Sequence, residues 1–329
     1  MKLCIPIADA AQGGMYSFFR NFRRWLDGRG MPHTDAIEEP WDVLVVNSWV
    51  TPYRRVLRAK RDHPRGRVLH RIDGSARDYG RDAASDTRQG LVNTLADVSV
   101  FQSAYGREAT RIRHRVIGQD GPVIHNPVDV ERFTPHGPRE ELPGPTRVIH
   151  VTWSTNPMKG GGHLGPLARR HPEVTFVLVG HYADLPELPN VILIGHADWD
   201  RLPRLLRSCE CLLILAENEA CPNVVLEAMA SGLPVLFRES GGTPELVGEC
   251  GVAVRPDSFG EGLTRVLARR SVLSAAARRR AEEHFAFDVL FPRYLAAATS
   301  AGRRPIPGPL GRLGGLWRDA SHRLGTGHR

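Results

Sequence analysis

Short apolar segments alternate with segments of helical character along the chain, and this alternation is the feature that most limits how it can fold. In the first half, the unbroken apolar run Val43–Val46 is typical of a strand buried on both faces of a sheet. Residues 2–7, 67–74 and 97–102 are predicted to be further strands, and 123–129 close this half. Strands separated by helices predict a doubly wound parallel sheet.

The first predicted helix, at about 15–26, has an aromatic face. Phe18, Phe22 and their neighbours recur at helical spacing, so this face should pack on a core. Further helices are predicted near 86–96 and from Ser103.

A proline-rich stretch separates the first half from a second series of strands. Residues 133–146 contain four prolines and two glycines, a composition typical of a linker. The apolar segments then resume and predict five more strands, at 147–153, 175–180, 190–195, 211–216 and 233–237. Two such domains would leave a cleft between them, and parallel sheets bind ligands beyond the carboxyl ends of their strands.

These patterns predict an α/β fold of two Rossmann-like domains with doubly wound parallel sheets. The expected parts are an N-terminal domain at 1–130, a linker at 131–146, a second domain at 147–287, a helix at 288–302 and a basic tail at 303–329.

The positive charge of the chain lies mostly in that tail. The formal net charge is +8, and residues 303–329 contain six arginines and one aspartate, which leaves only +3 elsewhere. The tail is rich in glycine and proline and is predicted to be mostly disordered. Its Leu310, Leu313, Leu316 and Trp317 would allow weak contact with an anionic membrane surface; a solvated extension is the alternative.

Composition narrows the class of protein further. No apolar run approaches the roughly 20 residues that span a bilayer, and the first residues lack the apolar region of a signal peptide. We therefore expect a cytoplasmic protein, with peripheral contact to the inner face of the membrane as the alternative. The five cysteines show no C-x-x-C spacing and predict reduced thiols rather than disulfides or a metal site.

Residues 217–248 carry the strongest functional signal. Pro222 suits a first helical turn and Gly232 the end of that helix, so 222–231 should form a short helix after a strand. Glu219 would lie on the preceding loop and Glu227 on the helix, both facing one cavity. The backbone N–H groups of Asn223, Val224 and Val225 would point into this cavity and favour an anion.

A second anion site is predicted directly after the next strand. Gly241 and Gly242 would let the backbone approach a ligand closely. Thr243 and Pro244 open the following helix, whose free amides would hold phosphate oxygens.

With these elements in order, the chain resembles glycosyltransferase family 4, a retaining family of the GT-B fold. The resemblance rests on the two glutamates seven residues apart, the run LEAMASGLPV and the motif GGTPE; it is strong over about 147–255. The segment HNPVDVERF at 125–133 is similar to the family's boundary motif. The resemblance implies transfer of a sugar from a nucleotide diphosphate sugar, with UDP, GDP and dTDP donors all open.

The resemblance also implies roles for individual residues. Glu227 would accept hydrogen bonds from the ribose, Glu219 would hold the donor sugar, and Gly242 with Thr243 would bind the diphosphate. Gly195 and His196 are expected near the base. Lys159 occupies the place of the family's lysine, one of two cations that meet the departing diphosphate.

One position departs from the family pattern. The family's arginine should lie about five residues before Lys159, where this chain has Ser154 and Thr155. Their hydroxyl groups, or Arg238, are the candidates for the missing interaction. Lysine is scarce here, at Lys2, Lys60 and Lys159 only, which adds weight to the prediction for Lys159.

Candidates in the N-terminal half are fewer. Asp9, Gly13 and Gly14 lie on the loop after the first strand, where relatives bring acceptor and donor phosphate close; a plain strand–helix turn is the alternative. His70 or Asp73 would take the place of the family's sugar-contacting residue. Asp73 is the predicted site residue, since His70 can equally be a buried strand residue.

The expectations on chemistry follow from this resemblance. No metal or cofactor is expected beside the donor, because helix dipoles and a cation would neutralise the charge of the diphosphate. Asp198-Trp199-Asp200 has the D-x-D pattern of a metal-binding motif but precedes a helical segment, so Asp198 should cap that helix. The acceptor would be a polysaccharide, a lipid-linked intermediate or a small natural product. A nucleotide-sugar epimerase or a phosphorylase on the same fold is the alternative. A nucleic-acid-binding protein is disfavoured, because the charge lies in the tail and no recognition motif occurs.

Overall fold

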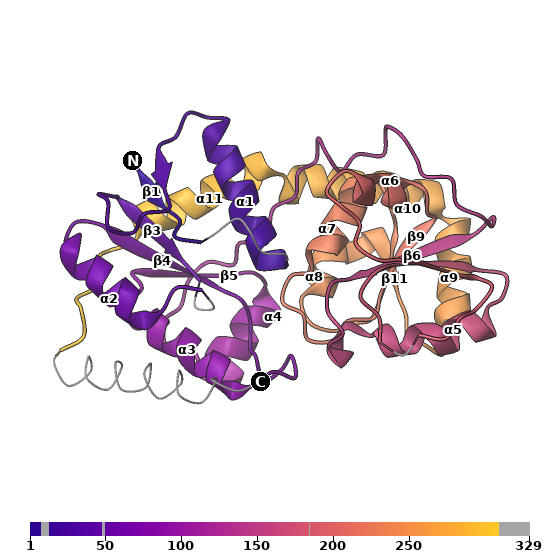
Figure 1. Cartoon of the computed structure of the whole chain (residues 1–329), viewed down its shortest axis with the longest axis horizontal. Coiled ribbons are helices and arrows are strands. Elements are labelled where there is room, and N and C mark those ends of the chain that lie inside the picture. The colour runs from indigo at the N-terminus through magenta and orange to yellow at the C-terminus, as the bar shows by residue number, and fades with distance from the viewer. Residues whose placement is uncertain (8–12, 48–49, 184, 309–329) are drawn as a thin grey trace. The chain divides into compact units, whose positions relative to one another are not determined.

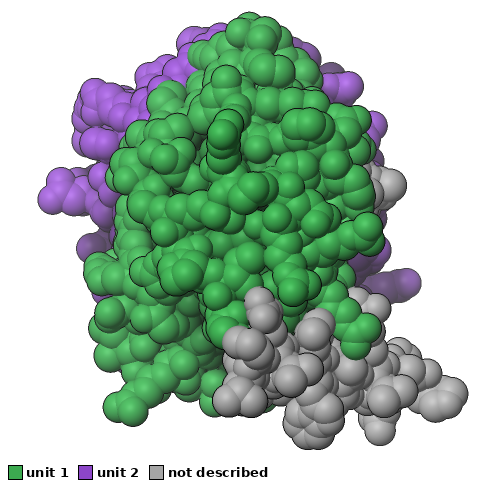
Figure 2. Space-filling view, turned by 90° about the vertical axis from the view of Figure 1, so that its left-hand side faces the viewer, with its two compact units in different colours: residues 1–125, 290–329 green, residues 126–289 purple. Residues whose placement is uncertain are grey.

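The computed structural model describes residues 1–7, 13–47, 50–183 and 185–308. The chain divides into two compact units (Figures 1 and 2). Unit 1 comprises 1–125 together with the chain from Leu290 onward, and unit 2 is Asn126–Val289. Each unit is built around one parallel sheet, so the predicted pair of Rossmann-like α/β domains is confirmed.

The sheet of unit 1 has the strand order β2-β1-β3-β4-β5. Its strands are β1 (Leu3–Cys4), β2 (His33–Thr34), β3 (Val43–Val46), β4 (Arg67–Ile72) and β5 (Val98–Phe101). The apolar run of β3 is wholly buried at the centre of the sheet, as its sequence predicted. Residues 123–129 add no strand; they make isolated bridges, one of them from Val123 to Phe101 of β5.

Amphipathic helices cover this sheet. They are α1 (Gly14–Asp27), α2 (Tyr53–Asp62), α3 (Ala83–Asn93) and α4 (Ala104–Arg107), which continues as a π-helical turn over Glu108–Arg113. The predicted aromatic face of α1 is buried, and Phe22 stacks on Phe291 at 4.7 Å between ring centroids. Phe291 belongs to α11 (Phe287–Ser300), so α11 packs on α1.

The sheet of unit 2 has the order β11-β10-β9-β6-β7-β8. Its strands are β6 (Arg147–Thr152), β7 (Thr175–Gly180), β8 (Val191–Ile194), β9 (Cys211–Ile214), β10 (Val235–Phe237) and β11 (Gly251–Ala253). Its helices are α5 (Leu164–Arg170), α6 (Arg201–Arg207), α7 (Asn223–Ala230), α8 (Thr243–Val247), α9 (Phe259–Ala268) and α10 (Arg270–Arg280). Because β10, β9 and β6 are neighbours, the loops that follow them meet at one edge.

The units divide at other positions than the sequence suggested. The boundary was expected at 130 with a linker at 131–146, whereas unit 2 begins at Asn126 and includes that segment. The segment is bound to unit 2 along its length: Arg278 donates to the carbonyls of Val130 and Phe133 at 2.8 Å, and Arg201 pairs with Glu140 at 2.6 Å. The segment is therefore part of unit 2 rather than a loose connection.

The start of the tail is also ordered, against expectation. Arg303 donates to the Lys60 carbonyl at 3.1 Å, and the Arg304 amide donates to Asp97 at 2.6 Å. Ile306 packs against the core of unit 1. Residues 309–329, with the predicted membrane-contacting side chains, lie outside the described residues. No helix in the described ranges has the length and apolarity to span a bilayer.

Candidate functional site

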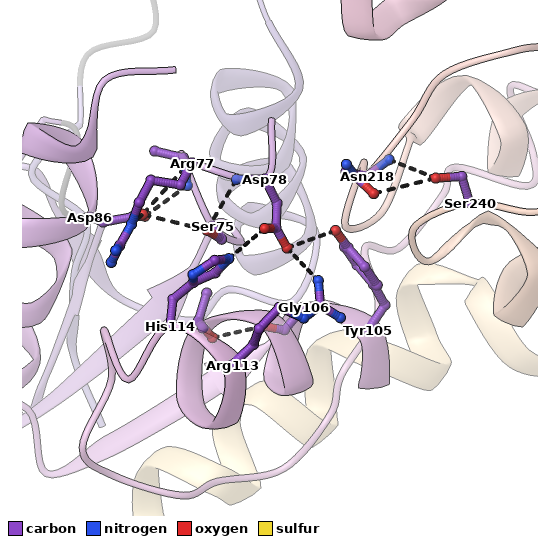
Figure 3. A network of polar contacts seen from close by, with 12 residues as sticks. Ser75, Arg77, Asp78, Asp86, Tyr105, Gly106, Arg113, His114, Asn218 and Ser240 are labelled. Atoms are coloured by element: carbon purple, nitrogen blue, oxygen red, sulfur yellow. Dashed lines mark hydrogen bonds and ion pairs between the residues drawn. The ribbon is translucent and has the colours of Figure 1, made fainter. Parts of the chain in front are cut away.

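Three loops of unit 2 converge beyond the carboxyl ends of β6, β9 and β10. The Glu217 amide donates to the Met158 carbonyl at 2.7 Å, which joins the first loop to the second. The Asn218 amide donates to the Ser240 hydroxyl at 3.0 Å, and the Gly242 amide to the Glu219 carbonyl at 2.8 Å, which join the second to the third (Figure 3). Residues that lie far apart in sequence therefore form one site.

The predicted residues Lys159 and Glu219 are in direct contact. The Lys159 Nζ lies 2.6 Å from Glu219 Oε1, and the two side chains are 22% and 19% exposed. The other carboxylate oxygen of Glu219, Oε2, is buried and accepts no hydrogen bond within the described part of the chain. A half-buried charge pair with spare acceptor capacity suits a polar ligand.

Two glycines make the close approach of these loops possible. Gly160 has φ +77°, and a Cβ there would lie 2.6 Å from the Leu215 carbonyl oxygen. Gly241 has φ +64°, and a Cβ there would lie 2.3 Å from the Glu219 carbonyl oxygen. Any other residue would be strained and would push the loops apart.

The turn after β10 differs in detail from the prediction. The Gly242 amide is engaged by Glu219, so it is not a free donor for phosphate. Thr243 is buried, and its hydroxyl has no partner among the residues that the structure covers. The prediction of diphosphate binding at this turn therefore depends on Gly241 and Thr243.

Glu227 lies on α7, the helix that the sequence predicted at 222–231. Burial raises the pKa of its carboxyl to about 7, while the positive charge of Arg132 acts to lower it. Arg132 is itself fixed, since its guanidinium lies 4.3 Å from the Trp199 ring centroid and 2.7 Å from Asp200 Oδ1. The pKa of this carboxyl therefore lies near neutral pH.

The start of α7 is held by a residue whose role the sequence interpretation missed. Asn126 is buried, and its Nδ2 donates to Asn223 Oδ1 at 2.7 Å and to the Cys221 carbonyl at 3.1 Å. The predicted amide donor at Val225 was wrong, because that N–H bonds to the Pro222 carbonyl at 3.2 Å. Asn223 and Val224 are partly exposed at the first turn. The HNP motif that contains Asn126 was the available signal.

The predicted substitutes for the family's arginine have separate places. Ser154 Oγ accepts a hydrogen bond from the Asn156 amide at 3.2 Å, so this hydroxyl shapes the turn before Lys159. Thr155 is exposed. Arg238, on the third loop, forms an ion pair at 2.7 Å with Glu217 of the second loop. Both side chains are about one-third exposed, so the guanidinium is partly accessible.

An aromatic pair lies at the β7 and β8 side of the same sheet edge. The rings of Trp153 and His196 are 5.4 Å apart at an interplanar angle of 43°. Gly195 and His196 are exposed, as a ligand site requires. Gly180 has φ +110°, and a Cβ there would lie 1.8 Å from the Thr152 carbonyl and 3.3 Å from the Trp153 ring. Trp153 was not predicted as a site residue.

The candidates of unit 1 have mainly internal contacts. Asp73 accepts from Asn47 at 2.5 Å, from Arg71 at 2.8 Å and from Gln102 at 3.2 Å. Arg71 is itself buried, and its guanidinium lies 4.2 Å from the Phe18 ring centroid, so Asp73 neutralises a charge within the unit. Its proposed contact with a sugar stays a prediction.

The other candidates of unit 1 are a turn and a strand residue. Gly13 precedes α1 with φ +126°, a conformation that favours glycine, and Gly14 begins the helix. Asp9 lies outside the described residues. His70 is buried in β4, and burial lowers its pKa to about 3, which fits the alternative of a neutral core histidine.

In the part of the chain that the structure describes there is no cluster of three or more histidine, cysteine, aspartate or glutamate side chains suited to a metal. Asp198 Oδ1 accepts from the Arg201 amide at 2.7 Å and from the Asp200 amide at 3.0 Å. It therefore caps α6, as predicted.

Comparison with known proteins finds similarity to glycosyltransferases. Residues 163–269 match the family described as "Glycosyl transferases group 1". A "GDP-mannose-dependent alpha-mannosyltransferase" of Mycolicibacterium smegmatis is 28% identical over 229 residues, which cover 63% of this chain and 59% of the relative. A "Glycogen synthase" of Mycobacterium tuberculosis is 31% identical over 178 residues, 48% of this chain and 42% of the relative. The chain thus spans only about half the length of such relatives.

Solved structures share the fold over nearly the whole chain. The sucrose-phosphate synthase of Thermosynechococcus elongatus gives a TM-score of 0.74 at 15% identity, covering 90% of this chain and 96% of that one. Anabaena HepE, solved in complex with UDP and glucose, gives 0.72 at 15% identity, covering 91% and 99%. The predicted GT-B fold and the resemblance to its glycosyltransferases are confirmed.

Proposed function

We propose that this chain, which has the GT-B fold and whose residues 163–269 match the glycosyl transferases group 1 family, transfers a sugar from a nucleotide diphosphate sugar to an acceptor hydroxyl. The observation that carries the proposal is the Lys159–Glu219 pair at the meeting point of three strand-end loops. Relatives named for GDP-mannose and a neighbour solved with UDP and glucose support a nucleotide-sugar donor.

The donor would lie along the edge of the unit 2 sheet. Its diphosphate would lie at Lys159, with the Gly241–Thr243 turn on the opposite side. Its ribose hydroxyls would donate to Glu227, and its sugar hydroxyls to the unused oxygen of Glu219. The strand order β10-β9-β6-β7-β8 would then direct the base toward Gly195, His196 and the ring of Trp153.

In the proposed reaction, the bond between the sugar and the diphosphate breaks, the acceptor oxygen forms a bond to the sugar, and the proton of the acceptor hydroxyl passes to the departing diphosphate. Negative charge develops on the departing diphosphate, and the Lys159 ammonium would stabilise it once the donor has displaced Glu219 as its partner. Arg238, held by Glu217, is the candidate for the second positive charge. Retention of configuration and independence from metal are part of this proposal, and no protein nucleophile is assigned.

Calorimetric titration with UDP, GDP and dTDP and their sugars tests the proposal. We expect one nucleotide to bind. The corresponding nucleotide sugar, at 100 times its dissociation constant, should raise the free energy of unfolding by about 2.7 kcal/mol. Binding should be lost in Glu227→Ala. Absence of heat with all three nucleotides would overturn the proposal, and a donor sugar altered without any acceptor would indicate an epimerase instead.

A further inference from the structure

A groove of about 560 Å³ lies on unit 1, between α3 and the segment 114–119. Its walls touch at one point, because a Cβ at Gly90 of α3 would lie only 2.7 Å from the Val116 carbonyl oxygen. All lining residues belong to unit 1, so the groove shares none with the donor site. Its size falls within the range of small-molecule sites.

The acidic charge of the groove is already neutralised. Asp86 is 2% exposed and accepts from Arg77 Nε at 3.0 Å and from the Ala76 amide at 2.7 Å. His114, another lining residue, hydrogen-bonds to Asp78 (Figure 3). The pair with Asp86 uses the charge of Arg77.

Two further arginines, Arg115 and Arg304, line the groove. Among the residues that the structure describes, neither Arg115 nor Arg304 forms an ion pair with its guanidinium. The backbone of Arg304 is fixed by its hydrogen bond to Asp97. Arg115 has φ +51°, a conformation that costs a non-glycine residue free energy and that clusters at ligand sites. Two positive charges are therefore held on one concave surface.

The floor of the groove is polar rather than apolar. Gln119 is 8% exposed, and its Nε2 donates to the carbonyls of Asn93 at 2.8 Å and Ala96 at 3.0 Å. Its Oε1 is buried without a donor in the described ranges, which a ligand hydroxyl would supply. Thr87 and Thr94 add hydroxyl groups to the lining.

From these contacts we infer that the α3 groove is a binding site for a phosphorylated sugar. Guanidinium groups pair with phosphate through two parallel hydrogen bonds, which is the interaction that Arg115 and Arg304 offer. The amide and hydroxyl groups of the floor and wall match the hydroxyls of a sugar ring. This inference concerns unit 1 alone and goes beyond the proposed transferase activity.

The test measures calorimetric binding of glucose 6-phosphate to the full chain, with glucose and inorganic phosphate as further probes. The double variant R115Q/R304Q removes both charges, and R115K/R304K retains them. The matched control is R61Q/R65Q, which removes two exposed arginines of the same unit that lie outside the groove. Lys159→Ala serves to exclude binding at the donor site.

We expect glucose 6-phosphate to bind more tightly than glucose or phosphate, and R115Q/R304Q to lower its affinity by about 30-fold or more. R61Q/R65Q and Lys159→Ala should bind it like the wild type. R115K/R304K keeps the two charges but loses the parallel hydrogen bonds, so its affinity should lie between that of the wild type and that of R115Q/R304Q. Nucleotide-sugar binding should be unchanged in R115Q/R304Q, so that this result is separate from the proposed transferase activity. Equal binding by R115Q/R304Q and R61Q/R65Q, equal affinity for inorganic phosphate and glucose 6-phosphate, or loss of binding in Lys159→Ala would overturn the inference.

Discussion

Two lysine–carboxylate pairs with the same separation lie in the two units, and their surroundings differ. In unit 1, Lys60 Nζ is 2.6 Å from Asp97 Oδ1 with both side chains fully buried; in unit 2, Lys159 Nζ is 2.6 Å from Glu219 Oε1 with both about one-fifth exposed. Asp97 also accepts from the amides of Val68 at 2.7 Å and Arg304 at 2.6 Å, whereas Glu219 has an oxygen without a described partner.

The difference separates a structural pair from one that is available to a ligand. Lys60 of α2 also donates to the Leu95 carbonyl, and Asp97 also accepts from β4 and from the segment after α11, so exchanging the partners of this pair would disturb the fold. The Lys159–Glu219 pair connects two loops beyond strand ends, where a ligand can replace either partner without unfolding a strand. Distance alone does not distinguish the two pairs; burial and the use of the remaining oxygens do.

The largest expected effect is on the structural pair. Lys60→Met leaves the Asp97 charge buried without its cation and should lower the free energy of unfolding by about 3–5 kcal/mol. Urea denaturation measures this change. Lys2→Met is the matched control, because Lys2 pairs with the half-exposed Glu39 and should cost no more than about 1 kcal/mol. Similar costs for both variants would show that burial does not set the strength of the pair.

The next effect is on the site pair and should appear in turnover instead. Lys159→Ala removes the charge that would stabilise the departing diphosphate and should lower turnover by about 10²-fold or more. Its free energy of unfolding should change by no more than about 1 kcal/mol, since the pair is partly exposed. A turnover assay with the donor found by calorimetry, run beside urea denaturation, makes the measurement. Normal turnover would remove Lys159 from the mechanism.

A smaller effect tests the close approach that holds the site pair in place. Gly241→Ala places a Cβ 2.3 Å from the Glu219 carbonyl oxygen and should weaken donor binding roughly tenfold by shifting that loop. Gly30→Ala is the control, because Gly30 has a similar φ of +60° but no atom within 4 Å of an added Cβ. Both variants carry the cost of the left-handed conformation, roughly 1 kcal/mol. Donor affinities that fall equally in both would refute a specific role for the Gly241 turn.

The same contrast shows how far the sequence alone could predict this molecule. Unbroken apolar runs such as Val43–Val46 located the central strands, because parallel strands are buried on both faces. Pro222 and Gly232 bounded α7 correctly, because their backbone preferences are local. Lys159 and Glu219 were both predicted as site residues from the resemblance to the family's motifs.

Partners distant in sequence were not predictable in this way. The HNP motif marked Asn126, but nothing local indicated that its partner would be the first turn of α7, or that Arg303 and Arg304 would bind unit 1. The proline-rich segment was interpreted as a linker because composition reports backbone freedom and not the arginines that later bind its carbonyls. Tertiary hydrogen bonds decided each of these cases.

The smallest expected effect is a pH dependence at Glu227, which sharpens the contrast within the site. Its carboxyl has a pKa of about 7 when folded and 4.5 as the ordinary value, so the folded protein holds this proton more tightly. The contribution of Glu227 to the free energy of unfolding therefore falls as the pH rises from about 4.5 to about 7. Glu227→Gln should remove this pH dependence. Ribose hydroxyls donate better to a carboxylate than to a carboxylic acid, so nucleotide affinity should rise about threefold to tenfold between pH 6 and pH 8. Calorimetric titration at pH 6 and pH 8 measures this change in affinity, with Glu227→Gln as the comparison. An affinity that does not change with pH in the wild type, or that rises equally in Glu227→Gln, would show that Glu227 does not bind the ribose.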